Sequence, residues 1–122
     1  MISVTAAEFE QAVEAALRSI PTEFEQFLEN VMIEIKDHPG REAAEMEEPD
    51  DILGLYVGIP IEDRMLEGLP PMPDCIYIYR KNLCDMCESK EELIDEIRIT
   101  VLHEIGHHFG LDEDRLDELG YA

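Results

Sequence analysis

The stretch of sequence that decides the fold runs from Ser89 to Gly110 and reads SKEELIDEIRITVLHEIGHHFG. It opens with the Ser-x-x-Glu pattern of a capping box, and its apolar residues then recur at spacings of one, three and four. That period predicts a helix of about five turns over 90–109. Gly110 is placed to end the helix, because glycine readily adopts the left-handed conformation that closes many helices.

The same helix carries two histidines four residues apart, His103 and His107, nearly opposite its broad apolar face. Glu104 lies beside His107 on the helical wheel and completes the pattern H-E-x-x-H. Two imidazoles one turn apart can bind one tetrahedral zinc ion, while the glutamate between them reaches the water that zinc activates. The alternative is a polar helix face that carries these residues without a metal. The spacing favours the metal site.

Three carboxylates follow this helix directly, at Asp112, Glu113 and Asp114. A turn at Gly110 would return them toward the two histidines, and the third-ligand position of the extended pattern H-E-x-x-H-x-x-G-x-x-(His or Asp) falls on Glu113. Zinc accepts a carboxylate oxygen, so Glu113 is the first candidate for the third ligand, with Asp112 or Asp114 as substitutes. The competing interpretation is that these acids only cap a last short helix.

Apolar patterning predicts two further helices and three strands ahead of this segment. They are helices over 6–19 and 22–30 and strands over 31–35, 53–57 and 75–79. Pro60 favours a sheet edge for the strand over 53–57, because proline cannot donate to a strand ladder. The acidic stretch 36–51 has little to bury and is expected to form an exposed, mobile loop.

Composition narrows the class of protein. The chain has 122 residues, of which 45% are hydrophobic, and this length fits one domain over 1–122. Its 9 basic and 30 acidic side chains give a net charge of −21, which excludes nucleic acid and anionic membranes as partners and favours basic ones. Without a basic leader or a long apolar run, a cytoplasmic location is expected.

Three cysteines, Cys75, Cys84 and Cys87, form an odd set that does not suggest a disulfide framework. Cys84 and Cys87 have the C-x-x-C spacing of half a zinc knuckle. No second such pair completes a four-ligand site, so the interpretation is a loop with two ordinary free thiols.

The segment from His103 to Tyr121, HEIGHHFGLDEDRLDELGY, resembles the signature of the small bacterial zincin-like metallopeptidases, also called minimal zincins. The likeness extends upstream to residues 53–56, 77–80 and the helix that begins at Ser89, and so covers nearly the whole chain. It implies an α+β fold in which a small three- to four-stranded sheet packs on helices, with the HExxH helix toward the C-terminus.

The resemblance also implies a site that holds one Zn²⁺ ion. By position His103 and His107 correspond to zinc ligands, Glu113 to the third ligand, and Glu104 to the general base. Such zincins usually have His or Asp where this chain has Glu113, which is longer than Asp by one methylene group. The implied function is a zinc-dependent metallopeptidase that hydrolyses peptide bonds through a water activated by Glu104.

Two other classes of function stay open at this point. One is a catalytically weak or inactive metal- or peptide-binding module with the same fold, and the other is an acidic partner of basic proteins that binds no metal. A peptidase of this kind is expected to act on peptides or unstructured proteins, with basic ones favoured by the charge. The sequence does not indicate an oligomeric state.

The resemblance to this family also implies two features of substrate binding. The strand over 53–57 is a candidate edge for an extended peptide, with Tyr56 either lining the cleft or buried in the core. Donors to the oxyanion are available at His108, Tyr56, Tyr121 and Arg115, and nothing in the sequence chooses among them. His108 follows a ligand on the helix and points about 100° away from it, which favours a supporting role over catalysis.

Overall fold

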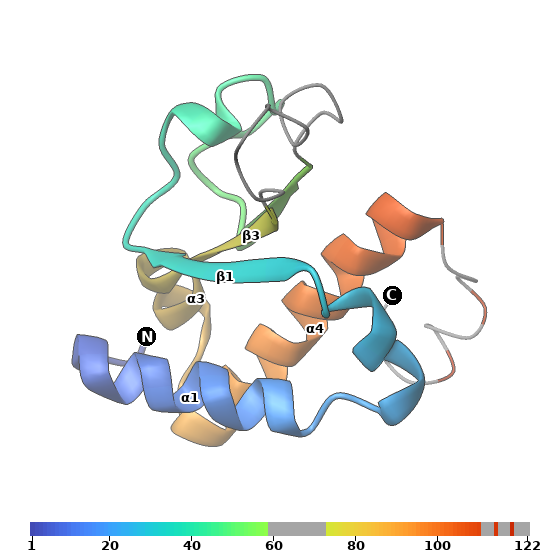
Figure 1. Ribbon diagram of the computed structural model, residues 1–122. Helices are drawn as coiled ribbons and strands as arrows, with labels where there is room; N and C mark the ends of the chain where they lie inside the picture. Colours follow the sequence, from blue (N-terminus) through green and yellow to red (C-terminus); the bar gives the residue numbers. More distant parts are fainter. Residues whose placement is uncertain (59–72, 111–113, 115–117, 119–122) are drawn as a thin grey trace, which may run out of the picture.

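The structure is a computed structural model that describes residues 1–58, 73–110, 114 and 118. Its architecture is α+β, as predicted: helices lie against one face of a small mixed sheet (Figure 1). The main elements are α1 (Ala6–Arg18), α3 (Arg80–Met86), α4 (Lys90–Phe109), β1 (Val31–Lys36), β2 (Gly54–Val57) and β3 (Asp74–Tyr79). None of the helices in these ranges is long and apolar enough to cross a membrane.

The sheet contains all three predicted strands, in the order β1-β3-β2. β1 runs parallel to β3, with Ile33 opposite Ile76, and β2 runs antiparallel to β3, with Leu55 opposite Tyr77. The strand nearest the C-terminus is therefore the central one, and β2 lies at an edge of the sheet, as Pro60 indicates.

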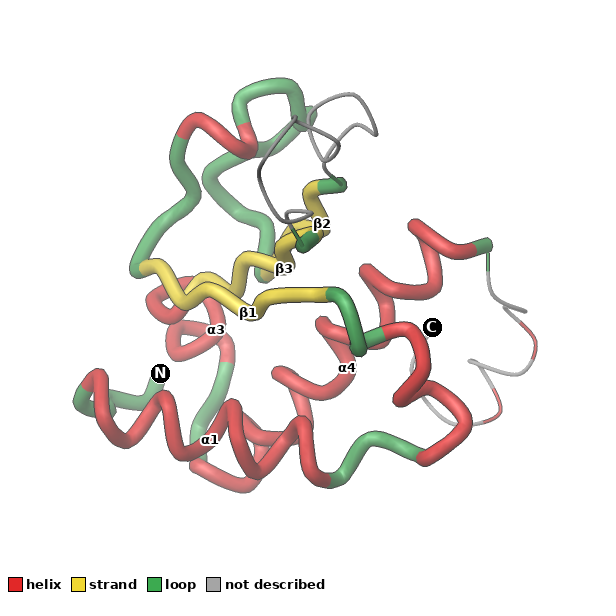
Figure 2. The backbone as a smooth tube through the Cα atoms, in the orientation of Figure 1, coloured by secondary structure: helices red, strands yellow, loops and turns green. Residues whose placement is uncertain are grey.

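The hydrophobic core lies between the sheet and the helices α1 and α4 (Figure 2). Ile76 and Ile78 are fully buried and belong to this core, because alternate residues of a strand point to the same face. The fully buried side chains that they join are Phe9, Leu83, Leu93, Ile97, Val101, Leu102 and Ile105, together with Ala16 and Cys87. The apolar face of α4 is thus used as its sequence predicts.

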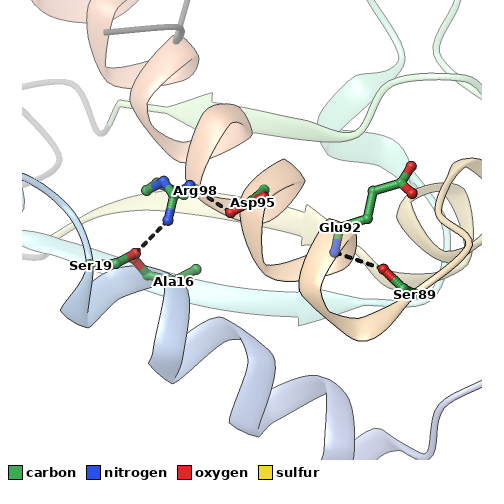
Figure 3. Close-up of polar contacts among 6 residues, drawn as sticks. All are labelled: Ala16, Ser19, Ser89, Glu92, Asp95 and Arg98. Atoms are coloured by element: carbon green, nitrogen blue, oxygen red, sulfur yellow. Dashed lines mark hydrogen bonds and ion pairs between the residues drawn. The ribbon is translucent and has the colours of Figure 1, made fainter.

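Polar contacts at both ends of α1 fasten it to α4. At the start of α1, Glu8 completes the capping box and also forms a 2.7 Å ion pair with Lys90 of α4. At its end, the guanidinium of Arg98 donates to Ser19 Oγ at 2.9 Å and pairs with Asp95 (Figure 3). These contacts add to the apolar packing between the two helices, to which Phe9 and Ala16 of α1 contribute.

The helix predicted over 22–30 is a 3₁₀ helix instead, η1 (Thr22–Phe27). Thr22 and Glu25 have the spacing of a capping box, which would place Thr22 at the cap with its hydroxyl accepting a backbone amide. In the structure Pro21 is the cap residue and makes no side-chain hydrogen bond. Without that cap the segment forms a short, tight helix that buries Phe24.

The loop predicted around Cys84 and Cys87 is wrong, because residues 80–86 form α3. Leu83, Cys84 and Cys87 occur at helical spacing, and all three are buried in the core. All three cysteines of the chain are free, and burial raises the pKa of each thiol.

The acidic segment 37–53 passes over the other face of the sheet (Figure 1). Most of its side chains are exposed, as predicted, but Ala43 is fully buried in a short 3₁₀ turn, η2 (Arg41–Ala43). The neighbouring Glu42 forms an ion pair with Lys36 of β1. This segment therefore covers Tyr77 and Tyr79, whose rings lie parallel on that face, and Tyr79 is fully buried.

Candidate metal centre

The last two turns of α4 bring His103, Glu104 and His107 together. One candidate ligand atom from each lies within 4.8 Å of the other two, and the imidazole ring centroids are 4.2 Å apart. His103 and Glu104 are half-buried and His107 is exposed, so solvent reaches the group. The structure thus assembles three of the four residues that the motif singles out.

The fourth residue, Glu113, lies outside the described residues, and so does its substitute Asp112. Asp114 is described and exposed, and the candidate cluster does not include it. The identity of the third ligand stays a prediction.

The donor set suits zinc. Two imidazole nitrogens and a nearby carboxylate are among the ligands that zinc binds in proteins. Within the described part of the chain, no hydrogen bond occupies a ring nitrogen of His103 or His107, so the nitrogens of this pair are available to a metal ion. Glu104 differs from the two histidines, because one of its carboxylate oxygens already accepts a hydrogen bond.

The donor of this hydrogen bond belongs to the edge strand β2. The backbone N–H of Tyr56 in β2 donates to Glu104 Oε1 at 3.0 Å. The backbone N–H of Tyr79 donates to the Leu53 carbonyl, and hydrogen-bonded positions alternate along an antiparallel pair. The amide of Tyr56 therefore points away from β3, toward α4. The strand predicted as an edge for a peptide thus also holds the glutamate of the motif, through this one amide.

A glycine allows this close approach of strand and helix. A Cβ atom at Gly54 would lie only 2.6 Å from Thr100 Cγ2 of α4 and 3.0 Å from the Tyr77 carbonyl oxygen. Glycine in a strand often marks such an approach, so Gly54 is the residue in the sequence that indicates a close contact here.

Tyr56 also contacts the histidine that follows the motif. The ring of His108 stacks on the Tyr56 ring at a centroid distance of 3.9 Å and an angle of 17°. The Tyr56 hydroxyl donates to Asp74 Oδ2 at 2.5 Å, and the His108 Nε2 lies 4.0 Å from the same oxygen. Both side chains join β2, β3 and α4, which fits the supporting role expected of His108.

The other two oxyanion candidates, Arg115 and Tyr121, lie outside the described residues. Tyr56 itself is half-buried and packs against the hydrophobic core. It is not among the described residues that line the pocket beside the motif, so packing against the core is the alternative that the structure supports.

A pocket of about 370 Å³ opens beside the motif, between α4 and residues 46–54. His103, Glu104 and His107 contribute to its lining, together with residues from the acidic segment and from the middle of α4. A pocket of this size is in the range of ligand sites in proteins. The candidate metal ligands are therefore accessible from a cavity as well as from bulk solvent.

Similarity to known proteins identifies the family and the fold of the chain. No curated protein matches the chain. Its fold is similar to that of a solved structure, a conserved hypothetical protein from Thermo thermophilus, with a TM-score of 0.54 and 22% sequence identity over 87% of this chain and 94% of the other. The sequence model of the zincin-like metallopeptidases matches residues 28–121, which include the sheet, the HExxH helix and the residues after it. The chain belongs to the zincin-like metallopeptidase family.

Proposed function

We propose that this chain is a zinc-dependent peptidase that hydrolyses peptides or unstructured proteins. The observation that carries the proposal is the convergence of His103, Glu104 and His107 at a pocket that a peptide side chain can enter. Membership in the zincin-like family supports the same reaction class. Zinc, when bound, would act as a Lewis acid that makes water acidic near neutral pH and polarises the carbonyl group.

The chain's own residues have separate roles in this proposal. His103 and His107 would hold the ion, and Glu113 would be the third ligand. Glu104 would accept the proton of the attacking water and pass it to the leaving amine. The Tyr56 amide, which binds Glu104 Oε1, would orient the carboxylate and leave the second oxygen free for the proton.

One observation favours a second candidate, a metal- or peptide-binding module without turnover. The Tyr56 amide already occupies Glu104 Oε1, so only the second oxygen is left to take a proton from water. A chain in which that oxygen does not reach the water would bind metal and peptide without turnover.

Zinc content and peptide cleavage by a small set of variants test the proposal. His103→Ala should lose zinc and cleavage together, whereas Glu104→Gln should keep zinc while the rate falls by a factor of about 10² to 10⁴. His38→Ala changes an exposed histidine outside the candidate site and should alter neither property. Glu113→Ala should weaken zinc binding if this residue is the third ligand.

Thermal unfolding supplies an independent readout of metal binding. Zinc at 100 times its Kd should stabilise the parent chain by about 2.7 kcal/mol and leave His103→Ala unchanged. A parent chain that binds zinc but cleaves no peptide would be the binding module. A parent chain that binds neither zinc nor peptide would contradict both functions.

A further inference from the structure

The pocket beside the candidate metal site has two kinds of lining. Met46, Ile52, Leu53 and Ile99 give it an apolar surface, and Asp51 and Glu96 add two carboxylates from opposite walls. No lysine or arginine is among its described lining residues. The chemistry of the pocket therefore suits a guest with a hydrocarbon stem and a positive end.

The two carboxylates are not neutralised from within the described chain. None of the ion pairs found there involves Asp51 or Glu96. The basic side chains that form pairs contact other acids, such as Asp37 with Arg80 and Asp95 with Arg98. A cation that enters the pocket would thus meet two carboxylates without an ion-pair partner among the described residues.

The backbone of both pocket walls is held in place in the absence of a ligand. The Asn82 side-chain amide of α3 donates to the backbone carbonyls of Asp50 and Ile52, at 2.9 Å and 2.8 Å, on either side of Asp51. Glu96 lies on the opposite wall within the long helix α4. Because the backbone of both walls is already ordered, binding would cost little conformational entropy in the walls.

We propose that this pocket binds a lysine or arginine side chain of the peptide substrate, with Asp51 and Glu96 as the residues that determine this specificity. The methylene stem packs on the apolar wall while the charged end stays near the carboxylates, as long basic side chains commonly do. An acidic side chain is repelled, and an uncharged one gains only the apolar contact. This inference rests on the proposed function, because it takes the bound side chain to be part of a peptide substrate.

Peptide binding by the zinc-treated full chain and by the same chain with chelator tests this assignment without requiring turnover. Three labelled, unstructured peptides of equal length would carry Lys, norleucine or Glu at one central position, and fluorescence anisotropy would give each Kd. We expect the Lys peptide to bind about five- to tenfold more tightly than the norleucine peptide, because two partly solvated pairs each contribute modestly. The Glu peptide should bind most weakly.

Two double variants with the same change of net charge locate the preference. Asp51→Asn with Glu96→Gln should reduce the difference between Lys and norleucine to less than twofold. Asp85→Asn with Glu91→Gln changes two exposed acids outside the pocket and should preserve it. Thermal melting of each variant checks that it is folded.

Three results would overturn the pocket assignment: equal binding of the Lys and norleucine peptides, an equal loss of preference in both double variants, or no binding of any peptide at millimolar concentration. Cleavage of the same peptides separates this outcome from a failure of the proposed function. A preference for Lys without cleavage would support the pocket assignment and refute the peptidase function. Cleavage without a preference for Lys would support the peptidase function and refute the pocket assignment.

Discussion

Replacing Gly54 with alanine should destabilise the protein by forcing β2 away from α4. The added Cβ would lie 2.6 Å from Thr100 Cγ2 and 3.0 Å from the Tyr77 carbonyl oxygen. Carbon atoms that are not bonded prefer about 3.5 to 4.0 Å, so the overlap with the Thr100 methyl group is about 1 Å. Overpacking of this kind costs about 1 to 3 kcal/mol, offset by about 0.4 to 1 kcal/mol from the less flexible unfolded chain.

Thermal unfolding followed by circular dichroism measures this cost. The central values, about 2 kcal/mol of cost less about 0.7 kcal/mol of offset, leave a net loss of about 1.3 kcal/mol. For a chain of this size 1 kcal/mol corresponds to about 3 to 6 °C, so the Tm should fall by roughly 4 to 8 °C. Gly40→Ala is a matched control, because its Cβ would meet only the ends of the flexible Glu42 and Lys36 side chains, each no closer than 3.1 Å. Its Tm should change much less.

A second substitution tests the stated cause directly. Thr100→Ser removes the methyl group that the new Cβ would meet, and in the parent chain it should cost about 0.8 kcal/mol. In the Gly54→Ala background the same change should restore stability, so the two effects should not add. A Gly54→Ala chain that melts with the parent, or a Thr100→Ser effect equal in both backgrounds, would refute the reasoning.

Two further predictions concern ionisable groups. The Lys90 ammonium and the backbone amide of Thr5 lower the pKa of Glu8 from 4.5 to about 2, so its stabilising effect should be present above pH 4.5 and fade as the pH falls toward 2. Glu8→Gln should therefore lower the Tm at pH 7 and not at pH 2, and an equal loss at both pH values would contradict this assignment. Burial raises the pKa of Cys84 above its ordinary value and that of Cys87 to about 11, so a thiol reagent at pH 8 should modify them only in denaturant. Rapid labelling of the native chain would show that these thiols are accessible.

Local signals explain why the functional helix could be predicted from sequence. The Ser89 side chain caps α4 by accepting the backbone amide of Glu92, as its capping pattern indicates (Figure 3). Gly110 ends the helix at a φ of 62°, in the left-handed conformation expected of it. His103 and His107 approach each other because four residues make about one helical turn. These features depend on neighbours within one or two turns of the same helix.

Contacts between distant segments explain what the sequence did not predict. Tyr56 and Glu104 are 48 residues apart, and no local pattern relates a strand amide to a helix carboxylate. The pocket likewise combines Asp51 with Glu96 from different elements. α3 is only seven residues long and is stabilised by the burial of Leu83 and neighbouring side chains, so its own propensity was too weak a signal.

The position of β3 between the other two strands has a consequence for how the chain folds. Among the described residues, β1 and β2 do not pair with each other, and each of them pairs with β3, which follows both in the sequence. During synthesis the two earlier strands therefore meet the partner that the described sheet gives them only after Asp74–Tyr79 has been made. The parallel pairing of Val31 with Asp74 also closes a long loop, which slows folding. A nascent chain would depend on its local helices, or on a chaperone, to keep these unpaired strands from aggregating.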